Sequence, residues 1–126
     1  MIDDNYLAWE VVAPLPTSIY SQALSYEVGT VKISLTADGL DVGKAIEITF
    51  KQCLAYRVVQ ESGRLKSLDN LTLGMFSKAN DSQFVNWFKD EGLGIYDDWE
   101  LTHYAIVTLD NIIDVITTIK PVIQIK

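Results

Sequence analysis

Two stretches in which apolar and polar residues alternate, with turn-forming residues between them, constrain the fold of this chain most strongly. The first stretch runs from Val31 to Leu35 and the second from Ile46 to Phe50. A period of two is typical of a strand with one buried face. Residues 38–43, Asp-Gly-Leu-Asp-Val-Gly, are typical of a turn. The sequence therefore predicts a hairpin whose inner face carries the alternating apolar side chains, among them Val31, Ile33 and Leu35.

Further strands are predicted on both sides of this hairpin. Residues 23–28 precede it, and residues 53–59 follow it with a composition that is typical of a strand. Within the later strand we expect Leu54, Tyr56 and Val58 to point inward. The polar stretch from Glu61 to Asn70 is interpreted as a connection on the surface.

One amphipathic helix is predicted from about Asp81 to Glu91. Phe84, Trp87 and Phe88 follow one another at helical spacing and define one face. The first turn can be capped by one of three neighbouring residues, which are Asn80, Asp81 and Ser82. Gly92 is expected to take the left-handed position after the last turn.

The last quarter of the chain is rich in β-branched residues. Residues 103–108 and 122–125 are predicted to be strands, the second at an edge because Pro121 precedes it. The stretch Ile112–Ile116 also fits one face of a helix that continues to Ile119. The density of branched side chains favours a strand there.

The expected fold class is mainly β (α+β). We predict an antiparallel β-sandwich or open barrel of about six or seven strands, with one short amphipathic helix laid over one end. A chain of 126 residues is the usual size of one domain, so residues 1–126 are expected to form a single domain. Strands and helices do not alternate along the chain, which argues against a parallel doubly wound sheet.

The net charge and the cysteine content of the chain restrict the cellular compartments and the kinds of partner to be expected. The formal net charge of −7 disfavours direct binding to nucleic acid or to an anionic membrane surface. It suits a basic protein partner, although acidity also serves solubility. A single cysteine, Cys53, cannot form an internal disulfide, and no signal-like or membrane-spanning stretch is found, so a cytoplasmic location is expected. The oligomeric state stays open.

Catalytic and metal-binding signatures are not found in the sequence. A Cys53–His103 dyad is possible, but Cys53 lacks the basic neighbours that stabilise a thiolate. One cysteine and one histidine cannot close a zinc or iron site, and Asp38 with Asp41 lacks the spacing of a calcium loop. Phosphate-binding glycine loops are missing as well. We therefore expect no catalytic residue, no metal and no cofactor, and a protein that is not an enzyme.

A local excess of carboxylates and aromatic rings follows the predicted helix. Glycines at 92 and 94 suggest a flexible loop there. Carboxylates raise the rate of encounter with a basic protein, and aromatic side chains hold the complex once they are buried. The alternative is a solvated loop whose Trp99 packs into the core. The candidate partner-binding residues are Asp90, Glu91, Tyr96, Asp97, Asp98, Trp99 and Glu100.

The run from His103 to Thr108, continuing through Ile113–Ile116 to Pro121, resembles a segment of the small bacterial immunity proteins that neutralise polymorphic or contact-dependent toxins. Residues 82–88 and the strand around residues 50–61 are similar to such proteins as well. The resemblance implies a stoichiometric inhibitor without enzymatic activity, which binds a cognate toxin domain. It identifies no single family and assigns no binding residue.

Two other functions fit the sequence. One is a small-molecule binding domain whose cavity would be lined by Trp9, Tyr26, Tyr56 and Phe76. The other is a structural subunit that assembles through exposed strand edges. An enzyme would come back into consideration if His103, Cys53 and a carboxylate met in a cleft.

Overall fold

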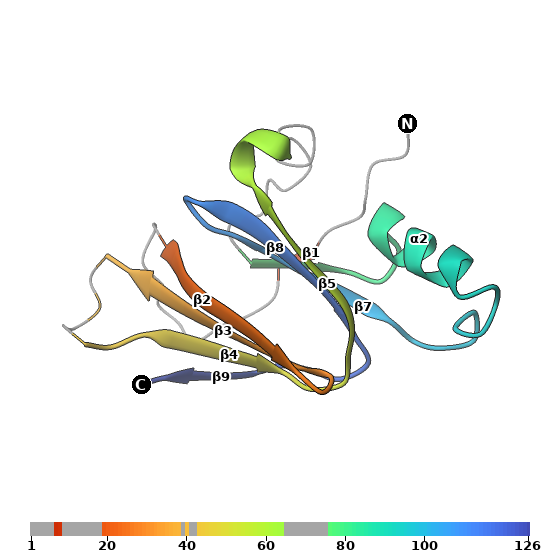
Figure 1. The fold of residues 1–126 in the computed structure, drawn as a ribbon, viewed down its shortest axis with the longest axis horizontal. Coiled ribbons are helices and arrows are strands. Elements are labelled where there is room, and N and C mark those ends of the chain that lie inside the picture. The colour runs from red at the N-terminus through yellow and green to blue at the C-terminus, as the bar shows by residue number, and fades with distance from the viewer. Residues whose placement is uncertain (1–6, 9–18, 39, 41–42, 65–75) are drawn as a thin grey trace.

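The computed structural model describes residues 7–8, 19–38, 40, 43–64 and 76–126. This part of the chain forms nine strands, one short 3₁₀-helix and one α-helix (Figure 1). The elements are β1 (Leu7–Ala8), β2 (Ile19–Glu27), β3 (Thr30–Ala37), β4 (Ile46–Phe50), β5 (Cys53–Gln60), η1 (Glu61–Gly63), β6 (Phe76–Ala79), α2 (Gln83–Glu91), β7 (Thr102–Val107), β8 (Asn111–Thr117) and β9 (Val122–Ile125).

The strands form two antiparallel sheets. The four-stranded sheet has the order β2-β3-β4-β9, and the five-stranded sheet has the order β1-β6-β7-β8-β5. Every strand pairing between the described residues is antiparallel. The mainly-β, sandwich-like prediction is therefore confirmed. The strand count was underestimated because β1 and β6 have only two and four residues, too few to produce a recognisable alternation.

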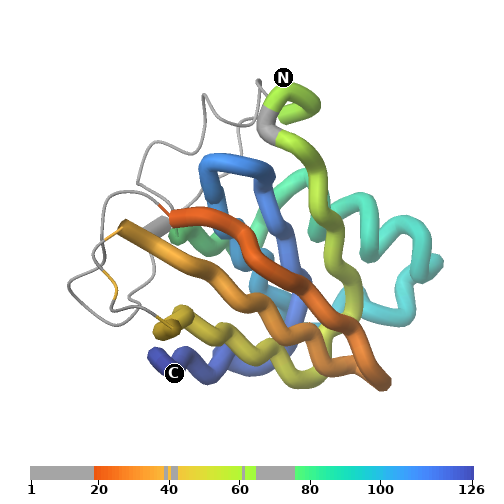
Figure 2. Tube along the Cα trace, turned by 60° about the vertical axis from the view of Figure 1, so that its left-hand side comes forward, coloured from red at the N-terminus to blue at the C-terminus, as the bar shows by residue number. Residues whose placement is uncertain are grey.

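The predicted hairpin is confirmed and supplies half of the core. Val31 is aligned with Phe50, and Ile33 with Ile48, so the two apolar faces coincide. These side chains are fully buried against the five-stranded sheet. Figure 2 shows the four-stranded sheet in front of the other strands, with β9 and the C-terminus at its edge.

Strands β7 and β8 of the five-stranded sheet are buried on both faces, so the molecule is three layers thick where α2 covers them. Tyr104 and Val115 pack toward the four-stranded sheet, whereas Ile116 packs against α2. Figure 1 shows α2 beside the five-stranded sheet, on the side away from the four-stranded sheet. Burial on both faces explains why β8 reads as an almost continuous apolar run that also fits a helix, and the preference for a strand there is confirmed.

Helix α2 begins after Ser82, whose side chain accepts a hydrogen bond from the Val85 amide. One of the three predicted caps is thus confirmed. Phe84 is buried and Trp87 is half in solvent, so the two do not share a buried face. The expectation for Gly92 was wrong: its φ is −81°, and the left-handed positions are taken by Leu93 and Gly94.

Other sequence predictions need correction near β5. Tyr56 and Val58 keep 38% and 45% of their surface exposed, because β5 lies at the edge of its sheet, where an inward-facing side chain has no strand beyond it. Arg64, expected on a surface connection, is buried. The rest of that connection, from 65 to 70, and positions 39, 41 and 42 of the predicted turn lie outside the described residues.

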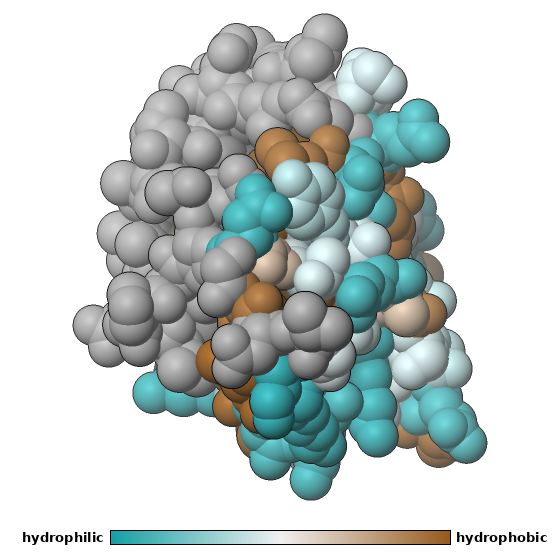
Figure 3. Space-filling view, turned by 90° about the vertical axis from the view of Figure 1, so that its left-hand side faces the viewer, coloured by the Kyte–Doolittle hydropathy of each residue, from teal (hydrophilic) through white to brown (hydrophobic). Residues whose placement is uncertain are grey.

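Hydrophilic and apolar residues alternate in small groups among the described residues at the end of the molecule shown in Figure 3. Among the helices of the described segments, none is long and apolar enough to span a membrane.

Candidate functional site

Residues 90–100 comprise the last two residues of α2 and the segment that follows it, and this stretch is held by a succession of tight turns. The amide of Leu93 donates to the carbonyl of Asp90, that of Asp97 to Gly94, and that of Trp99 to Tyr96, at 3.0–3.3 Å. The glycines therefore serve a folded chain of turns, where the sequence suggested a flexible loop. We call residues 90–100 the acidic segment below.

Aromatic side chains connect the acidic segment to the helix. The ring of Tyr96 lies 4.8 Å from that of Phe88 and 4.9 Å from that of Trp99, measured between centroids. Tyr96 is half-buried and packs with Phe88 and Leu101 near the start of β5. Trp99 lies edge-to-face against the Tyr96 ring and keeps 47% of its surface exposed. Trp99 does not pack into the core, so that alternative is wrong.

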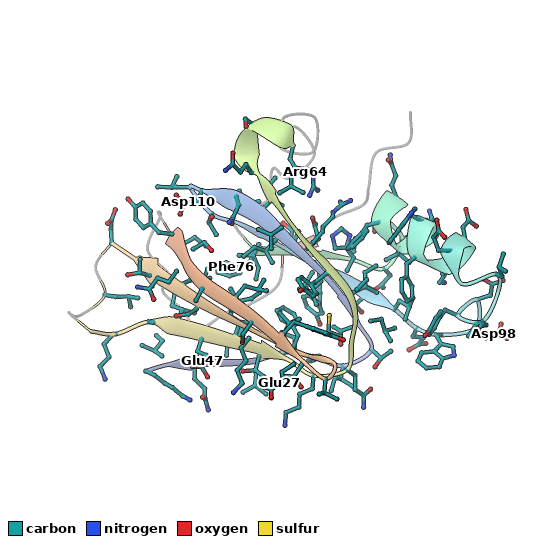
Figure 4. All side chains as sticks on the ribbon, viewed as in Figure 1. Glu27, Glu47, Arg64, Phe76, Asp98 and Asp110 are labelled. Atoms are coloured by element: carbon teal, nitrogen blue, oxygen red, sulfur yellow. The ribbon has the colours of Figure 1, made fainter. Side chains whose placement is uncertain are left out.

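All five predicted carboxylates of the acidic segment are exposed to solvent. Figure 4 places Asp98 at the tip of the turns beyond α2, at the opposite end of the molecule from Glu47. Within the part of the chain that the structure describes, none of the five forms an ion pair. The five exposed residues are Asp90, Glu91, Asp97, Asp98 and Glu100.

Apolar side chains stand between these carboxylates. Leu93 is 93% exposed and Ile95 is 72% exposed. Trp87, one helical turn before the segment, adds a half-exposed ring that stacks on Phe84. Trp87, Leu93 and Ile95 are not among the partner-binding residues predicted from the sequence, although apolar residues next to Gly92 and Gly94 in a turn-rich stretch indicate exposure. The surface combines negative charge with solvated apolar area.

A second cluster of polar groups lies beneath the N-terminus of α2, and its centre, formed by Ser82, His103 and Asp114, is buried. His103 Nε2 lies 2.6 Å from Asp114 Oδ1, and His103 Nδ1 lies 2.8 Å from Ser82 Oγ. Asp114 Oδ2 accepts hydrogen bonds from Arg57 Nε at 2.8 Å and from Arg64 Nη1. This Asp114 cluster joins three strands, the segment after η1 and the helix cap.

The direction of one of these hydrogen bonds follows from its acceptor. A carboxylate only accepts, so His103 Nε2 carries the proton that it donates to Asp114. The contact between His103 Nδ1 and Ser82 Oγ is a second hydrogen bond, and the protonation of the imidazole sets its direction. Ser82 Oγ still accepts from the Val85 amide at 3.1 Å. Helix α2 is thereby fastened to β7 and β8.

Serine, histidine and aspartate in one hydrogen-bonded line also occur in hydrolases, where the hydroxyl must reach a substrate carbonyl. Here Ser82 is 1% exposed, and His103 and Asp114 have no exposed surface. The Ser82 hydroxyl also caps a helix. In this structure the line is closed to a substrate and has a structural role.

The charge of Asp114 is stabilised by its neighbours. Burial alone would raise its pKa, but the hydrogen bond and charge of His103, followed by Arg64 and Arg57, outweigh burial and hold that pKa well below its usual value. Arg57 also lies over the Phe84 ring, with the guanidinium carbon 4.1 Å from the ring centroid. Arg57 therefore connects the buried charge of Asp114 to the packing of α2, because it contacts both Asp114 and Phe84.

The proposed Cys53–His103 dyad does not form. Cys53 belongs to the core between the sheets, whereas His103 faces Phe84 on the helix side of the five-stranded sheet. Burial raises the pKa of the Cys53 thiol to about 11, in spite of its hydrogen bond to the Ala55 carbonyl. Among the described residues, no group of three or more histidines, cysteines and carboxylates could hold a metal ion.

No family model, no curated protein and no solved structure matches this chain. The acidic segment and the Asp114 cluster must therefore be interpreted from their own geometry.

The residues suggested for a ligand cavity do not come together. Tyr26 and Tyr56 contact each other at the exposed edge of the sandwich, with 5.3 Å between ring centroids. Phe76 is buried in the core between the sheets. Trp9 lies outside the described residues.

Proposed function

We propose that this protein is a cytoplasmic, non-enzymatic binding protein. It acts as an immunity protein, which neutralises a cognate bacterial toxin by occluding the toxin's active or substrate-binding surface. The acidic segment is the docking surface. Its contact residues are Asp90, Glu91, Tyr96, Asp97, Asp98, Trp99 and Glu100. The partner is a basic protein domain.

The observation that carries this proposal is the set of exposed carboxylates without ion-pair partners among the described residues, interleaved with exposed apolar side chains. Charges at the rim of an interface mainly raise the association rate. Aromatic anchors such as Trp99 mainly slow dissociation, because they are desolvated in the complex. Both kinds of group are needed for a stoichiometric inhibitor.

Rigidity of the surface supports the same proposal. The acidic segment is folded by its own turn hydrogen bonds, and α2 is fastened to the sheet through Ser82 and His103. A surface that is ordered before binding loses less conformational entropy in the complex. Such an arrangement favours tight binding to one partner.

The test uses the C-terminal domain encoded by the reading frame immediately upstream in the native genome. We expect its expression in a bacterial host to arrest growth, and co-expression of this protein to restore growth. Isothermal titration calorimetry should give a complex with one copy of each chain. A domain that is not bound, or that arrests growth equally in the presence of this protein, would contradict the proposal.

Two matched variants locate the surface. Trp99→Ala should reduce the affinity at least 100-fold and abolish growth rescue, because it removes an aromatic anchor from the docking surface. Val122→Ala truncates a half-exposed apolar side chain of β9, at the edge of the four-stranded sheet, and provides the comparison in the same assay. Equal growth rescue by wild type and Trp99→Ala would argue against docking through the acidic segment.

A further inference from the structure

Ser77, on β6, carries the one buried side-chain oxygen or nitrogen among the described residues that has no hydrogen-bond partner. Ser77 has no exposed surface, so bulk solvent does not reach its hydroxyl. Buried hydroxyls are normally hydrogen-bonded, either to the protein or to an ordered water molecule, because leaving them unpaired is costly. The Ser77 hydroxyl therefore needs a partner that the described side chains do not provide.

Ser77 belongs to a row of residues that crosses the five-stranded sheet. The strand register aligns Ser77 with Ala105 of β7, and Ala105 with Asp114 of β8. The row faces the side of α2, because the residues next to each of the three along their strands form the core between the sheets. Ser77 and the Asp114 cluster thus share one face of the sheet, with only the methyl group of Ala105 between them.

The small side chain at position 105 leaves room between the two polar groups. Neighbouring strands are roughly 4.8 Å apart, so β6 and β8 are separated by roughly 10 Å. Serine and aspartate side chains are too short to meet across that distance. One water molecule can contact both, because each of its two hydrogen bonds adds about 2.8 Å.

Asp114 has an oxygen available on the side of Ser77. Its Oδ2 is turned toward β5, where it accepts from Arg57, and its Oδ1 is turned toward β7, where it accepts from His103. Arg64 supplies a third hydrogen bond, to Oδ2, and these three are the hydrogen bonds of Asp114 within the described part of the chain. Since a carboxylate can accept about four, Oδ1 can take one more from the direction of β6.

We propose that an ordered water molecule is bound above Ala105, where it accepts a hydrogen bond from the Ser77 hydroxyl and donates one to Asp114 Oδ1. The two arginines that contact Asp114 disfavour a cation at this position, and the carboxylate itself disfavours an anion. A small neutral molecule that both accepts and donates fits the site. The water extends the Asp114 cluster to β6, and this inference is independent of the proposed docking function.

The direct test is a high-resolution crystal structure of the full chain. Electron density for a water molecule should lie within hydrogen-bond distance of both Ser77 Oγ and Asp114 Oδ1. Solution NMR gives a second readout, in which the amides of Ser77 and Ala105 should show nuclear Overhauser effects to a slowly exchanging water. A crystal structure without density between these two oxygens would overturn the proposal.

Ser77→Ala distinguishes a hydroxyl that holds a water from one that has no partner. Removal of an unpaired buried hydroxyl should raise the melting temperature, whereas removal of one that binds the water should lower it by about 3–6 °C and abolish the water signal. Ser25→Ala, at an exposed position of β2, is the matched control and should leave the melting temperature unchanged. A melting temperature of Ser77→Ala above that of the wild type would contradict the proposal.

Ala105→Ser tests where the water lies. The new hydroxyl would occupy the space between Ser77 and Asp114, so the nuclear Overhauser effects from water to the Ser77 amide should disappear while the chain stays folded. Persistence of those effects in folded Ala105→Ser would show that any water near Ser77 lies elsewhere, and the proposed bridge to Asp114 would be wrong.

Discussion

Carboxylates play opposite parts in two regions of this molecule. Asp114 is fully buried and contacts His103, Arg57 and Arg64, so its charge is compensated inside the protein. Asp97 and Asp98 are exposed and unpaired within the described part of the chain. A buried charge needs hydrogen-bonding and charged partners within the fold, whereas exposed charges remain available to another protein.

The largest expected effect comes from removing the buried charge. Asp114→Asn removes the buried charge that Arg57, Arg64 and His103 all contact, which should lower the free energy of unfolding by about 3–5 kcal/mol. Urea unfolding followed by circular dichroism measures this change. Asp98→Asn is the matched control and should change stability by less than about 0.5 kcal/mol. Similar losses in both variants would remove the distinction between the regions.

The same comparison predicts a dependence on pH. The folded pKa of Asp114 is depressed below its unfolded value, so its contribution is complete above about pH 5 and is lost as the pH falls through and below about 4. Wild-type stability measured in urea should therefore decline in acid, and the decline should be smaller in Asp114→Asn. Parallel pH profiles for the two proteins would mean that other carboxylates dominate.

The helix cap should have an intermediate effect. Ser82→Ala removes the acceptor of the Val85 amide and the partner of His103 Nδ1, and should cost about 1–2 kcal/mol of stability. Ser25→Ala, at an exposed position of β2, should be nearly neutral. Denaturant midpoints of the two variants decide the matter, and an unchanged midpoint for Ser82→Ala would mean that the cap is dispensable.

The smallest expected effect has the opposite sign. Leu93→Asn places a residue that tolerates positive φ at an exposed turn, which should raise stability by about 0.5–1 kcal/mol. Ile95→Asn, a control at an exposed position of the same segment without positive φ, should not stabilise. A lower melting temperature for Leu93→Asn would show that Leu93 supports the fold after all.

The sequence predicted the hairpin, the antiparallel class, the helix and the exposed charge because each depends on local pattern. It did not reveal the Asp114 cluster, because the sequence gives neither the register between strands nor the position of α2. One signal was present. An aspartate within the apolar run Ile112–Ile116 must find partners when both faces of a strand are buried, and the only histidine of the chain lies on an adjacent strand.

Edges were the other source of error. Tyr56 and Val58 follow the alternation of an inner face, but pattern alone does not say which strand is last in its sheet. The sequence also did not predict that Leu93, and not Gly92, has a positive φ. Either residue can occupy a turn, and which of them takes the left-handed conformation depends on where the helix ends.

The central claim is that the acidic segment is a docking surface, and the association rate tests it most directly. Stopped-flow mixing with the upstream-encoded domain should show that Asp97→Asn/Asp98→Asn/Glu100→Gln associates at least tenfold more slowly at low salt, with an unchanged melting temperature. The control Asp38→Asn/Glu47→Gln removes carboxylates from the other end of the molecule and should associate like the wild type. Equal rates for all three proteins would contradict the account.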